Sequence, residues 1–246
     1  MIDMHSHILP GLDDGSPSLE VSLQMAHQAY ADGITWMAAT PHGPGADLAA
    51  GLRRRDAALT ELRQALQQAG LPLRIIPGME FMAGENILEK VSTQPGGFYG
   101  TGATAEGAAT HLMLIELFLG CDLTFCSELL FHAQLKNITL VLAHPERYPN
   151  FLKKGAFFQD LLEKGLYLQF NAHSLANGWL NRRQRNAILK LIRFCPNQIV
   201  LGSDAHDTSA RPARLSEPQK TIEKKLGKAI WQKISWQNSA QLLHIQ

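Results

Sequence analysis

The 246-residue chain lacks a paired set of cysteines, and this absence excludes several kinds of protein. Its three cysteines, Cys121, Cys126 and Cys195, are odd in number and form no Cys-x-x-Cys pair, which argues against a disulfide framework and a zinc knuckle. No arginine stands six positions after any of them, so the phosphate-binding signature of cysteine phosphatases is absent as well. We therefore expect three free thiols with no chemical role.

The chain also lacks an excess of charge and a long apolar run. Its 23 lysines and arginines against 22 acidic residues give a net charge of +1, so we expect no nucleic-acid partner. No apolar segment approaches the roughly 18–20 residues that span a bilayer, and we expect no membrane insertion. The N-terminus has no basic start followed by an apolar signal core, which favours a cytoplasmic location.

Short apolar runs alternate with helical stretches along the chain. Such runs are typical of parallel strands buried on both faces, and they occupy residues 2–7, 35–41, 73–81, 111–117, 138–144, 167–171 and 198–203. Helices are expected between them, the first capped by Ser16 and closed by Gly33, the others at about 47–70, 124–136, 155–165, 179–194 and 217–245. This alternation predicts an α/β fold, a barrel or a doubly wound sheet, in a single domain over residues 1–246. Residues 95–110, rich in Gly, Ala and Thr, predict a loop.

Metal-binding residue types gather at the ends of six of the seven predicted strands. They are His5, His7, Asp14, His42, Glu80, Glu116, His144, Asp204 and His206. Because the carboxyl ends of barrel strands meet at one rim, we expect these side chains to converge there. So many ionisable groups would be costly to hold together without cations, which predicts a metal site. The sixth strand ends at Asn171 and offers no obvious ligand.

The number of candidate ligands indicates more than one ion. Nine candidates exceed the roughly four to six bonds of a single cation, so we expect two or three ions that share a carboxylate. Mixed imidazole and carboxylate ligands suit Mn, Fe or Zn. Cations about 3.5–4 Å apart are typical of phosphoryl-transfer sites, and the residues therefore predict a phosphoester hydrolase.

Two arginines follow strand ends close to these ligands. Arg147 comes three residues after His144, and Arg211 comes five residues after His206. A guanidinium fork suits a pair of phosphate oxygens, so we expect both arginines to bind the phosphate. The arginine run at 53–55 is expected on a solvated helix face, and structural roles are expected for the other histidines, His27, His111, His132, His173 and His244.

Several short motifs together resemble the polymerase and histidinol phosphatase (PHP) superfamily. These motifs are His5-x-His7, Asp13-Asp14-Gly15, Thr40-Pro41-His42, Gly78-Met79-Glu80, Ala143-His144 and Ser203-Asp204-Ala205-His206. Within that superfamily, residues 1–15 and 144–148 are similar to the bacterial manganese-dependent protein-tyrosine phosphatases of capsule and exopolysaccharide loci. The resemblance runs in order from the N-terminus to about Pro212, although the stretch 96–109 looks longer than relatives usually carry.

The resemblance implies a distorted seven-stranded (β/α) barrel, the PHP fold, with three metal ions, of which Mn²⁺ is favoured. One ion would be held by His5, His7, Glu80 and Asp204. The second would be held by Glu80, Glu116 and His144, and the third by Asp14, His42 and His206. Arg147 and Arg211 match the arginines that would bind the phosphate. The implied reaction is direct in-line attack of an activated water on phosphorus, with no covalent enzyme intermediate.

The resemblance also implies a substrate, the phosphotyrosine tail of a bacterial tyrosine kinase that controls polysaccharide synthesis and export. A small-molecule phosphatase, such as one acting on histidinol phosphate, is the alternative enzyme. A metal-binding regulator without catalysis is the alternative from another class, although the complete ligand set argues against it. Homo-oligomers occur among relatives, and one is compatible with this chain.

Overall fold

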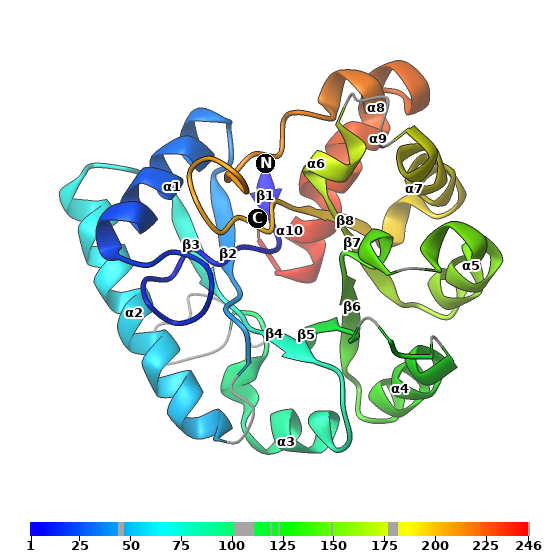
Figure 1. Cartoon of the computed structure of the whole chain (residues 1–246), viewed down its shortest axis with the longest axis horizontal. Helices are drawn as coiled ribbons and strands as arrows, with labels where there is room; N and C mark the ends of the chain where they lie inside the picture. The colour runs from blue at the N-terminus through cyan, green and yellow to red at the C-terminus, as the bar shows by residue number, and fades with distance from the viewer. Residues whose placement is uncertain are drawn as a thin grey trace.

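The strands of the computed structural model form a closed barrel of parallel strands (Figure 1). The structure describes residues 1–43, 47–100, 111–118, 120–122, 124–148, 150–176 and 182–245. The strands are β1 (Ile2–Asp3), β2 (Trp36–Ala39), β3 (Arg74–Pro77), β4 (Glu80–Met82), β5 (Leu112–Glu116), β6 (Thr139–Ala143), β7 (Tyr167–Asn171) and β8 (Ile199–Gly202). They form a three-stranded sheet, β1-β2-β3, and a five-stranded sheet, β4-β5-β6-β7-β8, in which every pairing is parallel.

Two isolated bridges join these sheets into a barrel. Beyond β1, Ser6 pairs in parallel with Ala205 beyond β8, and His42 beyond β2 pairs with Glu80 at the start of β4. Closure places the carboxyl ends of all the strands around one rim. The prediction of a distorted (β/α) barrel is confirmed, and the doubly wound sheet is excluded because its sheet would have free edges at both ends.

The predicted third strand, residues 73–81, is divided into β3 and β4 at Gly78 and Met79. The amide of Gly78 still donates to the carbonyl of Ala39, so the chain continues along the same side of the barrel. A Cβ at Gly78 would lie 3.0 Å from Cγ2 of Thr40 and 3.3 Å from the ring of Tyr99. The close approach of these side chains therefore favours glycine where the two sheets meet.

Helices surround the strands, as Figure 1 shows. They are α1 (Leu19–Ala31), α2 (Leu48–Gln68), α3 (Ile87–Thr93), α4 (Thr124–Leu135), α5 (Gly155–Glu163), α6 (Ala172–Leu175), α7 (Arg182–Phe194), α8 (Gln219–Leu226), α9 (Lys228–Gln232) and α10 (Asn238–Leu242). The larger apolar cluster lies between strands and helices, and a smaller one fills the barrel with side chains such as Met4, Leu114 and Val200. Every strand is thus buried on both faces, which explains its nearly continuous apolar sequence.

Two helical predictions were wrong in detail. Helix α1 is capped by Ser18, whose side chain accepts from the amide of Val21. The expected cap, Ser16, is buried and instead donates its amide to the carbonyl of His7, tying the loop to the rim. The predicted C-terminal helix, residues 217–245, is broken at Gly227, which has φ 97° and separates α8 from α9.

The C-terminal segment closes the barrel at the end opposite the rim. Asn238 of α10 donates through Nδ2 to the carbonyls of Pro196 and Ile199, at the start of β8. Ala240 belongs to the apolar cluster inside the barrel, and Trp236 packs against it. Among the described residues, this segment therefore covers the end of the barrel at which β8 begins.

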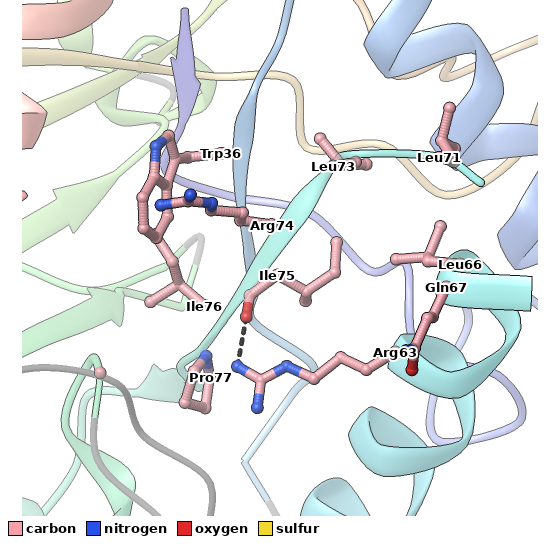
Figure 2. Close-up of a pocket in the computed structure, with 11 residues that line it drawn as sticks. Trp36, Arg63, Leu66, Gln67, Leu71, Leu73, Arg74, Ile75, Ile76 and Pro77 are labelled. Atoms are coloured by element: carbon pink, nitrogen blue, oxygen red, sulfur yellow. Dashed lines mark hydrogen bonds between the residues drawn. The ribbon is translucent and has the colours of Figure 1, made fainter.

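A cavity of about 400 Å³ lies at the outer edge of β3, beside the starts of β2 and β3 (Figure 2). Arg63 of α2 reaches across this cavity and donates to the carbonyl of Ile75, while Arg74 stacks over the ring of Trp36 at 4.7 Å (Figure 2). These contacts cover the strand edge, which would otherwise be open to pairing with another chain. Its lining residues run along the whole of β3 and include none of the nine predicted metal ligands.

Arg55 corrects the prediction of a solvated arginine run. Its side chain is fully buried, whereas Arg53 and Arg54 are exposed. Through Nη1, Arg55 donates to the carbonyls of Gly78 and Gly96, at 3.3 and 2.7 Å. It therefore connects α2 to the junction between the two sheets.

All three cysteines are free, as expected. Of the predicted loop at 95–110, residues 101–110 lie outside the described residues. Among the described residues, no helix is both long and apolar enough to cross a membrane.

Candidate metal centre

The structure brings all nine predicted ligands together at the rim of the barrel. Each has a ligand atom within 4.8 Å of those of at least two others. We call them the rim cluster: His5, His7, Asp14, His42, Glu80, Glu116, His144, Asp204 and His206. The inner members are buried, whereas the side chains of His42 and Asp14 are 41% and 64% exposed, so the cluster opens to solvent on that side.

Glu80 occupies the centre of the rim cluster. Its Oε2 lies 3.2 Å from Nε2 of His5, 3.3 Å from Nε2 of His7 and 3.3 Å from Nδ1 of His42. Its Oε1 lies 3.0 Å from Nε2 of His144 on the other side. A carboxylate with both oxygens facing different imidazoles has the arrangement of a bridging ligand.

Four overlapping groups in the cluster have the donors for a cation. They are His7, Asp14, His42 and His206; His5, Glu80 and His144; His5, His7 and Asp204; and His42, Glu80 and Glu116. These groups overlap with the three ligand sets that the resemblance implies but differ in composition: His5 is grouped with Glu80 and His144, and Glu80 is absent from the group of His5, His7 and Asp204. His7 also reaches the Asp14 group, and Glu116 lies closer to His42, at 3.4 Å, than to His144, at 3.9 Å.

Two members of the cluster have left-handed backbone conformations. His144 has φ 31° and Asp204 has φ 54°, both uncommon for residues other than glycine. The amide of Asp204 donates to the carbonyl of His5 at 2.7 Å, and the amide of His144 donates to Oε1 of Gln169 at 3.3 Å. These bonds hold the strained turns that direct both side chains into the cluster.

A chain of buried amides connects Asp204 to His5. A carboxylate can only accept, so Nδ2 of Asn171 donates to Oδ2 of Asp204 at 2.9 Å. Oδ1 of Asn171 then accepts from Nε2 of Gln169 at 2.8 Å, which leaves Oε1 of Gln169 facing Nδ1 of His5, also at 2.8 Å. His5 must therefore carry a proton on Nδ1, and its Nε2 points into the cluster.

Two other histidines are oriented in the same sense. Nδ1 of His7 donates to Oδ2 of Asp13 at 2.7 Å, and Nδ1 of His206 donates to the carbonyl of Asp204 at 2.9 Å. In both rings Nε2 faces the cluster. A carboxylate or carbonyl behind each imidazole is the arrangement that metal-binding histidines usually have.

The charges of the cluster are strongly coupled. Burial alone would raise the pKa of Glu80, but the neighbouring histidines hold that pKa well below its ordinary value. Burial would likewise lower the pKa of His7, yet hydrogen bonds to Asp13, Asp204 and Glu80 raise it well above the ordinary value. Burial and the charge of Glu80 raise the pKa of Glu116 to about 7. In the absence of metal, the positive charge of protonated imidazoles such as His7 therefore offsets the negative charge of carboxylates such as Glu80, a role that bound cations would otherwise take.

The donor set fits divalent cations. Nε2 of His5 and Nε2 of His7 face one another at 3.2 Å, while Nδ1 of each ring is bonded away from the cluster, to Gln169 and Asp13. Two imidazole nitrogens with converging lone pairs are stabilised by a shared cation. Mixed nitrogen and oxygen donors suit Mn, Fe or Zn.

Both predicted phosphate-binding arginines reach the cluster. Nη1 of Arg147 lies 3.1 Å from Oδ2 of Asp204, and Nη2 of Arg211 lies 2.6 Å from the same oxygen. Their side chains are 50% and 32% exposed, so both guanidinium groups border solvent as well. Both arginines thus lie between the Asp204 carboxylate and solvent.

Sequence reasoning missed the residues behind the ligands, namely Asp13, Gln169 and Asn171. Gln169 and Asn171 lie two residues apart in the buried strand β7, so both face the barrel interior. Two polar amides at this spacing in a buried strand were the available signal. Asp13 was noticed only as the neighbour of Asp14.

Comparison with known proteins places the chain in a family. A family model described as capsular polysaccharide synthesis, CpsB/CapC, matches residues 1–244. Tyrosine-protein phosphatase YwqE of Bacillus subtilis is 29% identical over 233 residues, which cover 94% of this chain and 87% of YwqE.

Solved structures agree with this assignment. A structure from a study of YwqE of B. subtilis and CpsB of Streptococcus pneumoniae, described as metal-dependent tyrosine phosphatases, superposes with a TM-score of 0.83 at 28% identity. It covers 100% of this chain and 95% of the other. A phosphotriesterase homology protein from Escherichia coli, at 11% identity, has a TM-score of 0.64 over 98% of each chain, which supports the barrel fold alone. The chain belongs to the CpsB/CapC family of capsular polysaccharide synthesis.

Proposed function

We propose that this chain is a metal-dependent protein-tyrosine phosphatase that hydrolyses phosphotyrosine with two or three cations bound in the rim cluster. The convergence of nine nitrogen and oxygen ligands around Glu80, with Arg147 and Arg211 beside them, carries the proposal. The family and its curated tyrosine phosphatases support it.

His5, His7, Glu80 and Asp204 would hold the innermost cation. His144 and Glu116 would complete a second site on Glu80, and Asp14, His42 and His206 would form the third, more exposed one. Divalent cations in such a site supply a nucleophile from water at neutral pH and neutralise phosphoryl charge. Manganese is the proposed metal, with iron and zinc as alternatives.

The residues of the chain itself would position the ester. Arg147 and Arg211 can release Asp204 and bind two phosphoryl oxygens through their guanidinium forks, which stabilises the charge of the transition state. Arg147 and Arg211 border solvent, so a phosphorylated side chain can enter from that side.

The proposed partner is the phosphotyrosine tail of a bacterial tyrosine kinase that controls polysaccharide synthesis and export, met in the cytoplasm. The family description in capsule synthesis and the names of the relatives support this partner.

The test compares a phosphotyrosine peptide with histidinol phosphate, each with added Mn²⁺ and then with chelator. We expect metal-dependent release of phosphate from the peptide. Turnover of histidinol phosphate alone would move the substrate to small molecules. No turnover of either ester by metal-loaded protein would contradict a phosphatase.

A further inference from the structure

A cavity of about 510 Å³ adjoins the rim cluster on the side of the two arginines. Its lining residues include Asp204, Arg147 and Arg211, together with His173, Arg214 and Glu217. Its volume lies within the range of roughly 300–1,000 Å³ that ligand sites occupy. His173, Arg214 and Glu217 have no role in the proposed reaction, although they line the same cavity as Asp204, Arg147 and Arg211.

Arg214 is an unpaired cation in this cavity. Within the part of the chain that the structure describes, its side chain has no hydrogen bond or ion pair, and it is exposed. Glu217 lines the same cavity without pairing with Arg214. Arg214 therefore differs from Arg147 and Arg211, which both hydrogen-bond to Asp204.

The backbone around Arg214 is held in place from both sides. Upstream, Oδ1 of Asp207 accepts from the amides of Ser209, Ala210 and Arg211 at 2.6 to 3.1 Å. Downstream, Oδ2 of Asp32, at the end of α1, accepts from the amides of Leu215 and Ser216 at 2.7 and 2.9 Å. A loop fixed in this way presents its arginine at a defined place, which lowers the entropy lost when a ligand binds.

The charge of the cavity favours an anion. Its charged lining residues are three arginines, Arg147, Arg211 and Arg214, and two carboxylates, Asp204 and Glu217. In the metal-loaded protein a cation would neutralise Asp204. Burial lowers the pKa of the neighbouring His173, so that ring adds no charge at neutral pH. Since Arg147 and Arg211 are assigned to the scissile phosphate, Arg214 remains for a second anionic group.

We propose that Arg214 is a specificity-determining residue that binds an anionic group next to the phosphotyrosine of the substrate, either a carboxylate or a second phosphate. This inference rests on the proposed function and adds to it a preference among phosphotyrosine peptides. An exposed arginine that pairs with such a group raises kcat/KM by about two- to fivefold.

The experiment measures kcat/KM of the Mn²⁺-loaded protein on phosphotyrosine peptides that differ only beside the phosphotyrosine. The flanking residue is Ala, Asp, Lys or a second phosphotyrosine, on one side and then on the other, and p-nitrophenyl phosphate serves as a substrate without flanks. We expect the Asp or doubly phosphorylated peptide to exceed the Ala peptide by about two- to fivefold and the Lys peptide to fall below it. The two anionic peptides distinguish a carboxylate from a phosphate.

The variant Arg214→Glu should remove or reverse this preference, measured as the ratio of peptide to p-nitrophenyl phosphate turnover. Lys224→Glu makes the same charge change at an exposed position of α8 outside the cavity, and it should keep the wild-type ratio. An unchanged preference in Arg214→Glu, or equal turnover of all peptides by the wild type, would overturn the inference while leaving the phosphatase intact. Failure on p-nitrophenyl phosphate and on every peptide would overturn both.

Discussion

The side-chain amide of Asn171 donates through Nδ2 to Oδ2 of Asp204 across 2.9 Å. This bond fixes the orientation of Asn171 and, through it, that of Gln169, which accepts from Nδ1 of His5. Through three hydrogen bonds, the Asp204 carboxylate thus decides which nitrogen of His5 faces the rim cluster. The relay is fully buried, so water does not compete for its hydrogen bonds.

Substitution of Gln169 tests this relay. Gln169→Met keeps the volume but removes the acceptor behind His5, and we expect the affinity for Mn²⁺ to fall about 10- to 100-fold. Gln169→Glu keeps an acceptor for Nδ1 of His5 and should retain more affinity. Titration followed by the electron paramagnetic resonance of free Mn²⁺ measures both, with Gln24→Met, at an exposed position of α1, as control. Equal affinities in wild type and Gln169→Met would show that the relay does not hold the ligand.

Glu80 should be the ligand whose loss removes most metal. Both of its oxygens face imidazoles, so Glu80→Gln weakens more than one cation site at once. We expect bound metal per chain to drop and kcat to fall by more than about 100-fold. Elemental analysis and phosphate release are the measurements, and Glu85→Gln, exposed before α3, is the matched control. Full metal content in Glu80→Gln would rule out a bridging role.

Arg147 and Arg211 should act through the fork of the guanidinium rather than through charge alone. Arg147→Lys and Arg211→Lys keep the charge but lose bidentate binding, so kcat/KM should fall by about 10- to 1,000-fold. Inhibition by inorganic phosphate should weaken in parallel, while metal content stays at the wild-type level. Arg193→Lys, at an exposed position of α7, provides the control. A lysine variant with wild-type kcat/KM would remove that arginine from phosphate binding.

Arg55 should matter for stability and not for chemistry. Arg55→Ala leaves the buried carbonyl of Gly78 and the partly buried carbonyl of Gly96 without this donor, and we expect the free energy of unfolding to fall by about 3 kcal/mol. Arg54→Ala, at the exposed neighbouring position, should change it by no more than about 0.5 kcal/mol. Urea denaturation measures both, and similar values for the two variants would contradict the structural role.

The part of the fold that could be predicted follows from the spacing of apolar residues along the chain and from the composition of each segment. Continuous apolar runs gave the strands because a parallel barrel buries both faces of each strand. The division of residues 73–81 into β3 and β4 was not predictable, because it arises from the junction of two sheets at Gly78, where Thr40 and Tyr99 approach closely. Ser16 failed as a helix cap because its backbone binds the loop after β1 instead.

The metal ligands of the candidate site could be predicted from the sequence, whereas the residues that hydrogen-bond to these ligands could not. A ligand at a strand end is visible in sequence because strand ends converge in any barrel. The partners Asp13, Gln169 and Asn171 depend on which side chains meet in space, as do the left-handed turns at His144 and Asp204. Arg55 was misjudged because its neighbours in sequence are exposed and its contacts lie 23 and 41 residues away.

Whether cations in the rim cluster drive phosphotyrosine hydrolysis can be measured by stripping the protein of metal and reloading it stepwise with Mn²⁺. Phosphate release from a phosphotyrosine peptide and bound metal per chain would be measured at each step. We expect no turnover in the stripped protein, turnover that rises with occupancy, and no recovery in Asp204→Ala. Undiminished turnover without metal, or no turnover at full occupancy, would show that the rim cluster does not drive the reaction through bound cations.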